Sequence, residues 1–255
     1  MNDEREAALF RSLIYLADTI VTGFDVIDLA DRLVSTCDEL LGAAAAGILL
    51  DDQRGGLRVL ASSSEELRIL ELLELQANEG PCLEAFETGE LVAAVDLSAH
   101  KRRWPGYVRH ALRLGFVSAY AIPMRLRERT IGALNIFQAS PEPMSTTDLQ
   151  VAQVLTSMAT IGLINHQALR RQELLAEQLQ TALNSRIAIE QAKGVIAERA
   201  GVDMNAAFDL LRSAARSSRR PLSELAADVA AGRMPDGHFG IASPGPDQAR
   251  RSKTH

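Results

Sequence analysis

Residues 115–137 read GFVSAYAIPMRLRERTIGALNIF, and they carry the clearest β-strand pattern of the chain. It contains two apolar runs, 117–122 and 130–137, each of a length typical of a β-strand. The polar segment RLRER lies between them, and Pro141 and Pro143 close the block. The pattern predicts two neighbouring strands joined by a polar turn.

The chain before this stretch predicts further elements that return to the same sheet. Residues 9–22 and 25–41 place apolar side chains at helical spacing, and Asp25 is a suitable N-cap for the second helix. Apolar runs at 44–50 and 57–61 flank a turn-like segment and predict a β-hairpin. The remaining predicted elements are helices at 64–77, 83–89 and 104–114 and a strand at 91–95. Helices covering one antiparallel sheet make an α+β fold.

The chain after the stretch predicts a long helix and a small helical bundle. Helical spacing runs from Thr146 to about Arg199, and Gly201 is placed to end that helix. Asp203 is a suitable N-cap for a second helix, and Pro221 suits the first position of a third. Apolar residues on one face of each helix predict a single core, namely Ile189, Ala192, Ile196 and Ala200, then Phe208, Leu211 and Ala215, then Leu222, Leu225, Ala226 and Val229.

The net charge of -6 is distributed unevenly along the chain. Residues 1–165 carry 23 acidic and 14 basic side chains, whereas residues 166–234 carry 8 acidic and 10 basic ones. Arg212, Arg216 and Arg219 recur at helical spacing and so project from one side of the second helix of the bundle. Such guanidinium groups suit phosphate oxygens, although a solvated charged face is the alternative. The candidate phosphate-binding residues are Lys193, Arg199, Arg212, Arg216, Arg219 and Arg220.

The connecting segment, residues 166–185, predicts a stiff helix with an apolar seam. Leu175, Leu179, Ala182 and Ile189 follow a heptad-like spacing, interrupted by Arg186. This spacing favours a two-stranded coiled coil and therefore a homodimer. A helix packed on its own domain is the alternative.

No catalytic centre is predicted. His100, His110 and His166 are isolated from cysteines and carboxylates at metal-ligand spacing, so no metal site is expected either. Cys82 follows Pro81 at the start of a short helix, where the helix dipole would lower the pKa of its thiol. The alternative is that Cys82 is a small buried apolar residue. Candidate pocket residues are Cys82, Glu84 and Tyr120, with no cofactor identified.

Composition favours a cytoplasmic protein. Two cysteines are too few for a disulfide framework, the first ten residues lack an apolar leader, and no apolar run reaches the ~20 residues that span a bilayer. The segment 234–255 is rich in proline, glycine and serine and is predicted to be disordered.

Residues 10–165 resemble a GAF domain. The resemblance lies in LLGAAAAGILLDD, in NEGPCLEAFETGELVAAVDLS and above all in the two-strand stretch at 115–137, with Ile122-Pro123-Met124 and Ile131-Gly132-Ala133-Leu134-Asn135. It implies an antiparallel sheet flanked by helices over residues 1–165. It also implies a sensor that binds a small molecule or dimerises.

Residues 172–233 resemble an ANTAR domain. The matching residues are Ile189-Glu190-Gln191-Ala192-Lys193-Gly194, then Ala206-Ala207-Phe208 with Leu211-Arg212, then Leu222 through Ala226. The resemblance implies a three-helix RNA-binding domain that acts as a dimer on paired stem-loops in nascent transcripts. Because the apolar stripe assigns Phe208 to the core, contacts to phosphates and 2′-hydroxyls, and the shape of the hairpin, are expected to dominate recognition.

Taken together, the residues and the two resemblances predict an RNA-binding transcription antiterminator under the control of a sensor domain. The alternative is a signal-sensing dimerisation or protein-interaction module that does not touch nucleic acid. DNA binding is not expected, because Glu224 and Asp228 make the third helix of the bundle acidic. Salt dependence of binding separates the two hypotheses.

Overall fold

The computed structural model describes residues 3–21, 24–52 and 54–233. The chain divides between Leu169 and Arg170 into two compact units. The prediction of disorder at 234–255 lies outside the described residues. None of the helices in the described part of the chain is long and apolar enough to cross a membrane.

The first unit is built on a five-stranded antiparallel sheet in the order β2-β1-β5-β4-β3. The strands are β1 (Ala45–Asp51), β2 (Leu57–Ser62), β3 (Val92–Ala94), β4 (Ser118–Leu126) and β5 (Arg129–Gln138). The predicted hairpin of β1 and β2 and the predicted pairing of β4 with β5 are both confirmed.

The turn between β4 and β5 is shorter than the sequence predicts. The pairs Arg125–Thr130 and Leu126–Arg129 continue the ladder almost to its tip. Only Arg127 and Glu128 remain in the turn, and Arg127 has a left-handed φ of 56°. The prediction was wrong because these polar side chains face solvent while their main chain still pairs across the strands.

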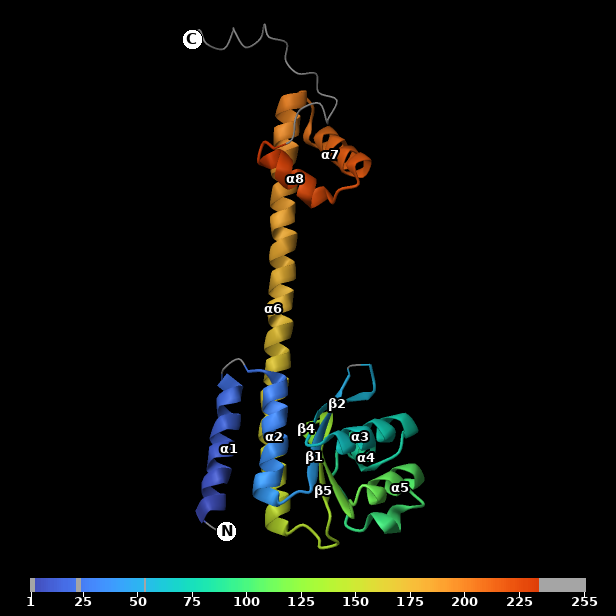
Figure 1. Cartoon of the computed structure of the whole chain (residues 1–255). Helices are drawn as coiled ribbons and strands as arrows, with labels where there is room; N and C mark the ends of the chain where they lie inside the picture. The colour runs from blue at the N-terminus through green and yellow to red at the C-terminus, as the bar shows by residue number, and fades with distance from the viewer. Residues whose placement is uncertain (1–2, 22–23, 53, 234–255) are drawn as a thin grey trace. The chain divides into compact units, whose positions relative to one another are not determined.

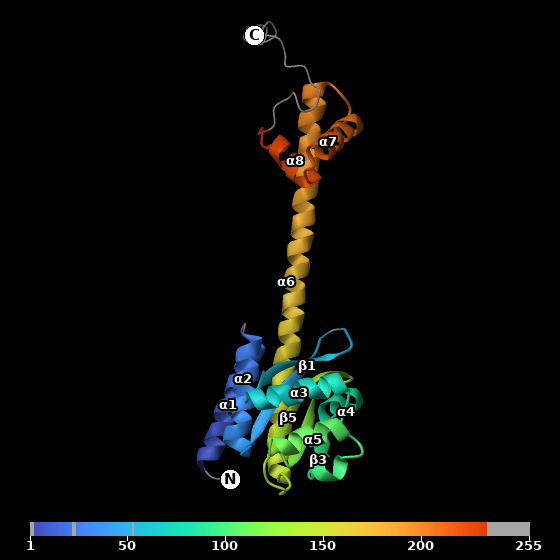
Figure 2. The ribbon, with the colours of Figure 1, turned by 45° about the vertical axis from the view of Figure 1, so that its right-hand side comes forward.

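Helices cover both faces of the sheet (Figures 1 and 2). On one face lie α1 (Asp3–Val21), α2 (Val26–Leu41) and the first part of α6 (Thr146–Ala200). On the other lie α3 (Glu65–Ala77), α4 (Pro81–Thr88), the short 3-10 helix η1 (Leu97–His100) and α5 (Pro105–Arg113). Asp25 and Ser64 cap α2 and α3 by accepting backbone N–H groups, as predicted.

Strand alternation divides the apolar residues of this unit into two cores. Along β4, Ala119 and Ala121 face α3, α4 and α5, whereas Tyr120 and Ile122 face α1, α2 and α6. The α3 side also holds Trp104, the only tryptophan of the chain. A side chain on β4 therefore reaches one core or the other, according to its position.

The second unit joins the end of α6 to α7 (Met204–Ser218) and α8 (Leu222–Ala230). Gly201 ends α6 with φ 65°, and Asp203 caps α7, as predicted. Pro221 is the N-cap of α8 and not its first helical residue. The buried core consists of Ala192, Ile196, Ala207, Leu211, Ala214, Ala215, Leu225, Ala226 and Val229.

Phe208 lies outside this core, contrary to the prediction. Its neighbour Ala207 is fully buried with Leu211, while Phe208 is only half-buried. Helical spacing alone is compatible with either residue on the apolar face, since Phe208 lies three positions and Ala207 four positions before Leu211. The smaller residue takes the interior position.

Candidate functional sites

Two glutamates of α3 are completely buried beneath the sheet. Glu71 and Glu74 each have 0% of their surface exposed and lie among the apolar residues of α3. Asn135 Nδ2 donates to Glu71 Oε1 at 3.3 Å, and Ser62 donates to the other oxygen of Glu71. The N–H of Cys82 donates to Glu74 Oε1 at 2.8 Å. In the described part of the chain, neither carboxylate forms an ion pair.

Each buried carboxylate fits against a glycine. A Cβ atom at Gly47 in β1 would collide with the Glu71 carboxylate, and one at Gly80 would collide with the Glu74 carboxylate. Gly80 also has a φ of 149°, a conformation that other residues rarely adopt. The sequence thus leaves space for both acidic side chains inside the first unit.

Burial governs the ionisation of this cluster. Loss of solvation raises the pKa of Glu71 to about 7 and that of Glu74, which also feels the charge of Glu71, to about 8. Burial likewise raises the pKa of the Cys82 thiol well above its usual value. Of the two alternatives for Cys82, a thiol pKa lowered by the helix dipole is therefore wrong, and the small buried residue is confirmed.

Several polar atoms of this region have no hydrogen-bond partner among the described residues. They are Glu74 Oε2, the Tyr107 hydroxyl, Asn135 Oδ1 and Ser118 Oγ. Buried polar atoms are usually satisfied by protein or by ordered water. The first three belong to the glutamate cluster or are coupled to its charges, so ordered water is a suitable partner for them.

The pocket residues predicted from the sequence do not meet at one site. Cys82 lies in the core beside Glu74, but Glu84 lies on the outer side of α4 and pairs with Arg103. Tyr120 faces the opposite core, where its hydroxyl accepts the N–H of Met144 at 2.9 Å. Glu71 and Glu74 were not predicted as site residues, although their spacing from Leu67 and Leu70 places all four on one helical face.

The second unit carries an exposed row of arginines on α7. Arg212 and Arg216 are one turn apart on this helix. Arg219 is also exposed but has left the helix, since it is the C-cap with a left-handed φ of 53°. Among residues 170–233, no carboxylate pairs with any of the three. We call these three residues the arginine row.

The other predicted phosphate-binding cations differ from the arginine row. Arg220 pairs with Asp228 at 2.6 Å and with Arg233 lowers the pKa of that carboxyl. Lys193 donates to both carboxylate oxygens of Glu190, at 3.0 and 2.9 Å, and its side chain is 16% exposed. Arg199 is exposed on the last turn of α6. Of the predicted phosphate-binding residues, the three of the arginine row are exposed and have no carboxylate partner among the described residues.

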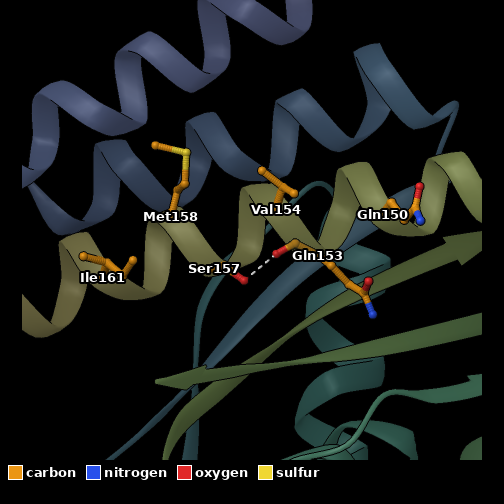
Figure 3. Close-up of a pocket in the computed structure, with 6 residues that line it drawn as sticks. All are labelled: Gln150, Gln153, Val154, Ser157, Met158 and Ile161. Atoms are coloured by element: carbon orange, nitrogen blue, oxygen red, sulfur yellow. Dashed lines mark hydrogen bonds between the residues drawn. The ribbon is translucent and has the colours of Figure 1, made fainter. Parts of the chain in front are cut away.

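A third surface lies on α6. Within the first unit, the helix lines an open hollow of about 490 Å³ (Figure 3), bordered by Gln150, Gln153, Val154, Ser157, Met158 and Ile161. Val154, Met158 and Ile161 project from the same helix, and Val154 is 47% exposed.

Further along α6, Leu175 and Leu179 are more than half exposed. Ile189, which was assigned to the same seam, packs against the core of the second unit.

The comparisons with known proteins bear on both units. A GAF domain family model matches residues 25–163, which is more than half of the chain. The chain belongs to the GAF domain family. An ANTAR domain model matches residues 177–229. A search of curated proteins gave no match. The GAF match contains the buried glutamate cluster, and the ANTAR match contains every predicted phosphate-binding residue.

Solved structures agree with the GAF fold. The GAF domain of a phosphoenolpyruvate-protein phosphotransferase from Acinetobacter is 18% identical, with a TM-score of 0.51 over 66% of this chain and 97% of that one. Its counterpart from Coxiella burnetii is 17% identical, with a TM-score of 0.51 over 64% and 96%. The free methionine-R-sulfoxide reductase from Neisseria meningitidis, in complex with its substrate, is 18% identical, with a TM-score of 0.50 over 66% and 95%. At these identities the likeness shows the fold alone.

GAF and ANTAR domains are sensor and regulatory domains. The described residues of the chain contain no group of three or more His, Cys, Asp or Glu that could hold a metal ion. The candidate functional sites are therefore the buried glutamates of the GAF domain and the arginine row of the ANTAR domain.

Proposed function

We propose that the chain is an RNA-binding transcription regulator, an antiterminator whose ANTAR domain binds paired hairpins in nascent mRNA under the control of the GAF domain. The observation that carries the proposal is the arginine row. Arg212 and Arg216 are exposed and unpaired among the described residues, while Lys193 and Arg220 are held by carboxylates. Unpaired guanidinium groups at fixed spacing suit successive phosphates of a folded RNA.

The proposed RNA contacts are chiefly to the backbone. Arginines that bind phosphates release condensed counterions, so binding should weaken steeply as salt rises. A-form RNA presents phosphates and 2′-hydroxyls on its accessible surface, and a hairpin stem is read by its shape. Arg212, Arg216 and Arg219 are assigned to the stem, and Arg199 on the end of α6 to the flanking backbone.

We propose that the active form is a homodimer joined along α6. Val154, Met158, Ile161, Leu175, Leu179 and Ala182 fall on one heptad register, and the intervening seam positions are Asn165, Ala168 and Gln172. A dimer carries two ANTAR domains, so the second hairpin of a pair binds at a high effective concentration. The domain division at residues 1–165, 166–185 and 172–233 is part of the same proposal.

Replacing Leu179 with glutamate tests the dimer. We expect the variant to be monomeric at micromolar concentrations by analytical ultracentrifugation, because a charge at a seam position must be buried against its copy. Its affinity for two linked hairpins should fall at least tenfold, with little change for one hairpin. Leu174→Glu is the matched control, since Leu174 is equally exposed but lies off the register. A dimeric Leu179→Glu variant would refute this interface.

We further propose that the GAF domain receives its signal as a small polar molecule at the Glu71–Glu74 cluster. The unsatisfied atoms of Glu74, Tyr107 and Asn135 support this position. The raised pKa of Cys82 argues against a thiolate sensor, because the thiolate is the reactive form. Native mass spectrometry of the full chain and of a Glu71→Gln, Glu74→Gln double variant measures whether a retained ligand depends on these residues.

The experiment that tests the RNA-binding function is cross-linking of the full chain to cellular RNA, followed by sequencing. We expect paired stem-loops near terminators to be enriched, and an Arg212→Gln, Arg216→Gln variant to lose that enrichment. If the full chain enriches no stem-loop while remaining dimeric, the chain is instead a dimerisation or protein-interaction module.

A further inference from the structure

The single aromatic residue of the ANTAR domain lies at the edge of its core. Ala207, Leu211, Ala214 and Ala215 of α7 are buried, whereas Phe208 is half-buried and outside the cluster. Aromatic side chains contribute most to stability when they are fully buried. The core of this domain consists largely of alanine and leucine. The position of its only aromatic ring at the margin of that core therefore points to a role at the surface.

Lys193 of α6 holds this ring. Its Nζ lies 5.8 Å from the ring centroid, a distance typical of a cation–π contact. The same ammonium donates to both oxygens of Glu190. Lys193 is therefore occupied by two neighbours and mostly covered, which makes it a poor phosphate ligand but a good support for Phe208.

Phe208 and the two helical members of the arginine row lie on the same side of α7. Phe208 precedes Arg212 by four residues and Arg216 by eight, so all three project from neighbouring positions on one side of α7. Successive members of this series are about 6 Å apart along the helix axis. The ring thus stands at one end of a line formed with Arg212 and Arg216, where an RNA stem held by these arginines would continue into its loop.

We propose that Phe208 stacks on an unpaired base of the hairpin loop while Arg212 and Arg216 hold the stem, with Lys193 as a positioning residue for the ring. The inference rests on the RNA-binding function proposed above and adds to it a means of recognising the loop. Stacking on an aromatic ring requires an unstacked base, which a hairpin loop supplies and a stem does not. Phosphate contacts alone would not distinguish one loop from another.

The test uses the full chain and the stem-loop RNA that it cross-links most strongly. A second RNA keeps the same stem but closes it with abasic ribose units. We expect Phe208→Leu to weaken binding to the first RNA by about tenfold and to leave binding to the abasic RNA unchanged, because the ring has a base to stack on only in the first. Phe208→Tyr keeps the ring and should restore the loss.

Two further readouts separate stacking from a structural role. The Phe208→Leu loss should stay constant as salt rises, whereas the loss caused by Arg212→Gln should shrink. If Phe208→Leu weakens both RNAs equally, or neither, the stacking proposal is overturned even though RNA binding stands. If the wild-type chain binds no stem-loop, the proposed function fails and the stacking proposal fails with it.

Discussion

Exchanging Arg212 and Arg216 together for glutamine should lower the affinity of the chain for its stem-loop RNA by about 100-fold in dilute salt. A phosphate contact from arginine is a charge-assisted hydrogen bond worth roughly 1.5–3 kcal/mol. At the lower end of this range, losing two contacts costs about 3 kcal/mol, a factor of slightly more than 100. The slope of log affinity against log salt should also fall by about 2, one for each phosphate released. Filter binding or fluorescence anisotropy at several salt concentrations measures both quantities.

The double variant should fold normally, because both side chains are exposed and unpaired among the described residues. Arg170→Gln with Arg171→Gln is the matched control, since it removes the same charge from exposed positions of α6 outside the ANTAR match. We expect this control to bind nearly as tightly as the wild type. Equal losses in the two double variants would mean that net charge, and not the arginine row, governs binding.

The stability of the GAF domain should fall as pH rises through neutrality. The pKa values of Glu71 and Glu74 are about 7 and about 8 in the folded chain and near 4.5 when exposed, so the folded form binds more protons. The contribution of the two glutamates to the free energy of unfolding is fully retained below pH 4.5. It is lost progressively as the pH rises to 8. Within this window, each glutamate can lower the free energy of unfolding by up to about 1.4 kcal/mol per pH unit. Urea unfolding followed by the fluorescence of Trp104, which is buried in the same core, measures the change.

Glu74→Gln should flatten this pH dependence. Glutamine keeps an oxygen that can accept the N–H of Cys82 but carries no charge to bury. At pH 9 we expect the variant to be more stable than the wild type, and at pH 5 the difference should be small. Glu66→Gln is the control, because Glu66 is exposed on the same helix. If wild type and Glu74→Gln lose stability equally with pH, Glu74 is not the titrating group.

The order of helices and strands could be read from the sequence because it depends on local patterns. Periodicity located the β1–β2 hairpin, and the caps at Asp25, Ser64 and Asp203 follow from side-chain chemistry within three residues of each helix start. The long α6 followed from the absence of proline and glycine over residues 165–193.

The sites could be predicted only in part, because they depend on contacts between distant segments. Gly47 and Glu71 are 24 positions apart in the sequence, and nothing local marks them as neighbours. Cys82 and Tyr120 were predicted to line one pocket, but the alternation of β4 places Tyr120 in the opposite core. Arg212 and Arg216 were easier to identify, because their exposure follows from the helix that carries them.

Single-round transcription through a terminator preceded by the two stem-loops that the chain cross-links decides whether the chain is an antiterminator. We expect the wild-type chain to raise read-through and the Arg212→Gln, Arg216→Gln variant not to raise it. The Arg170→Gln, Arg171→Gln control should retain the effect. Read-through that is unchanged by the wild-type chain, or raised equally by the arginine-row variant, would contradict the account.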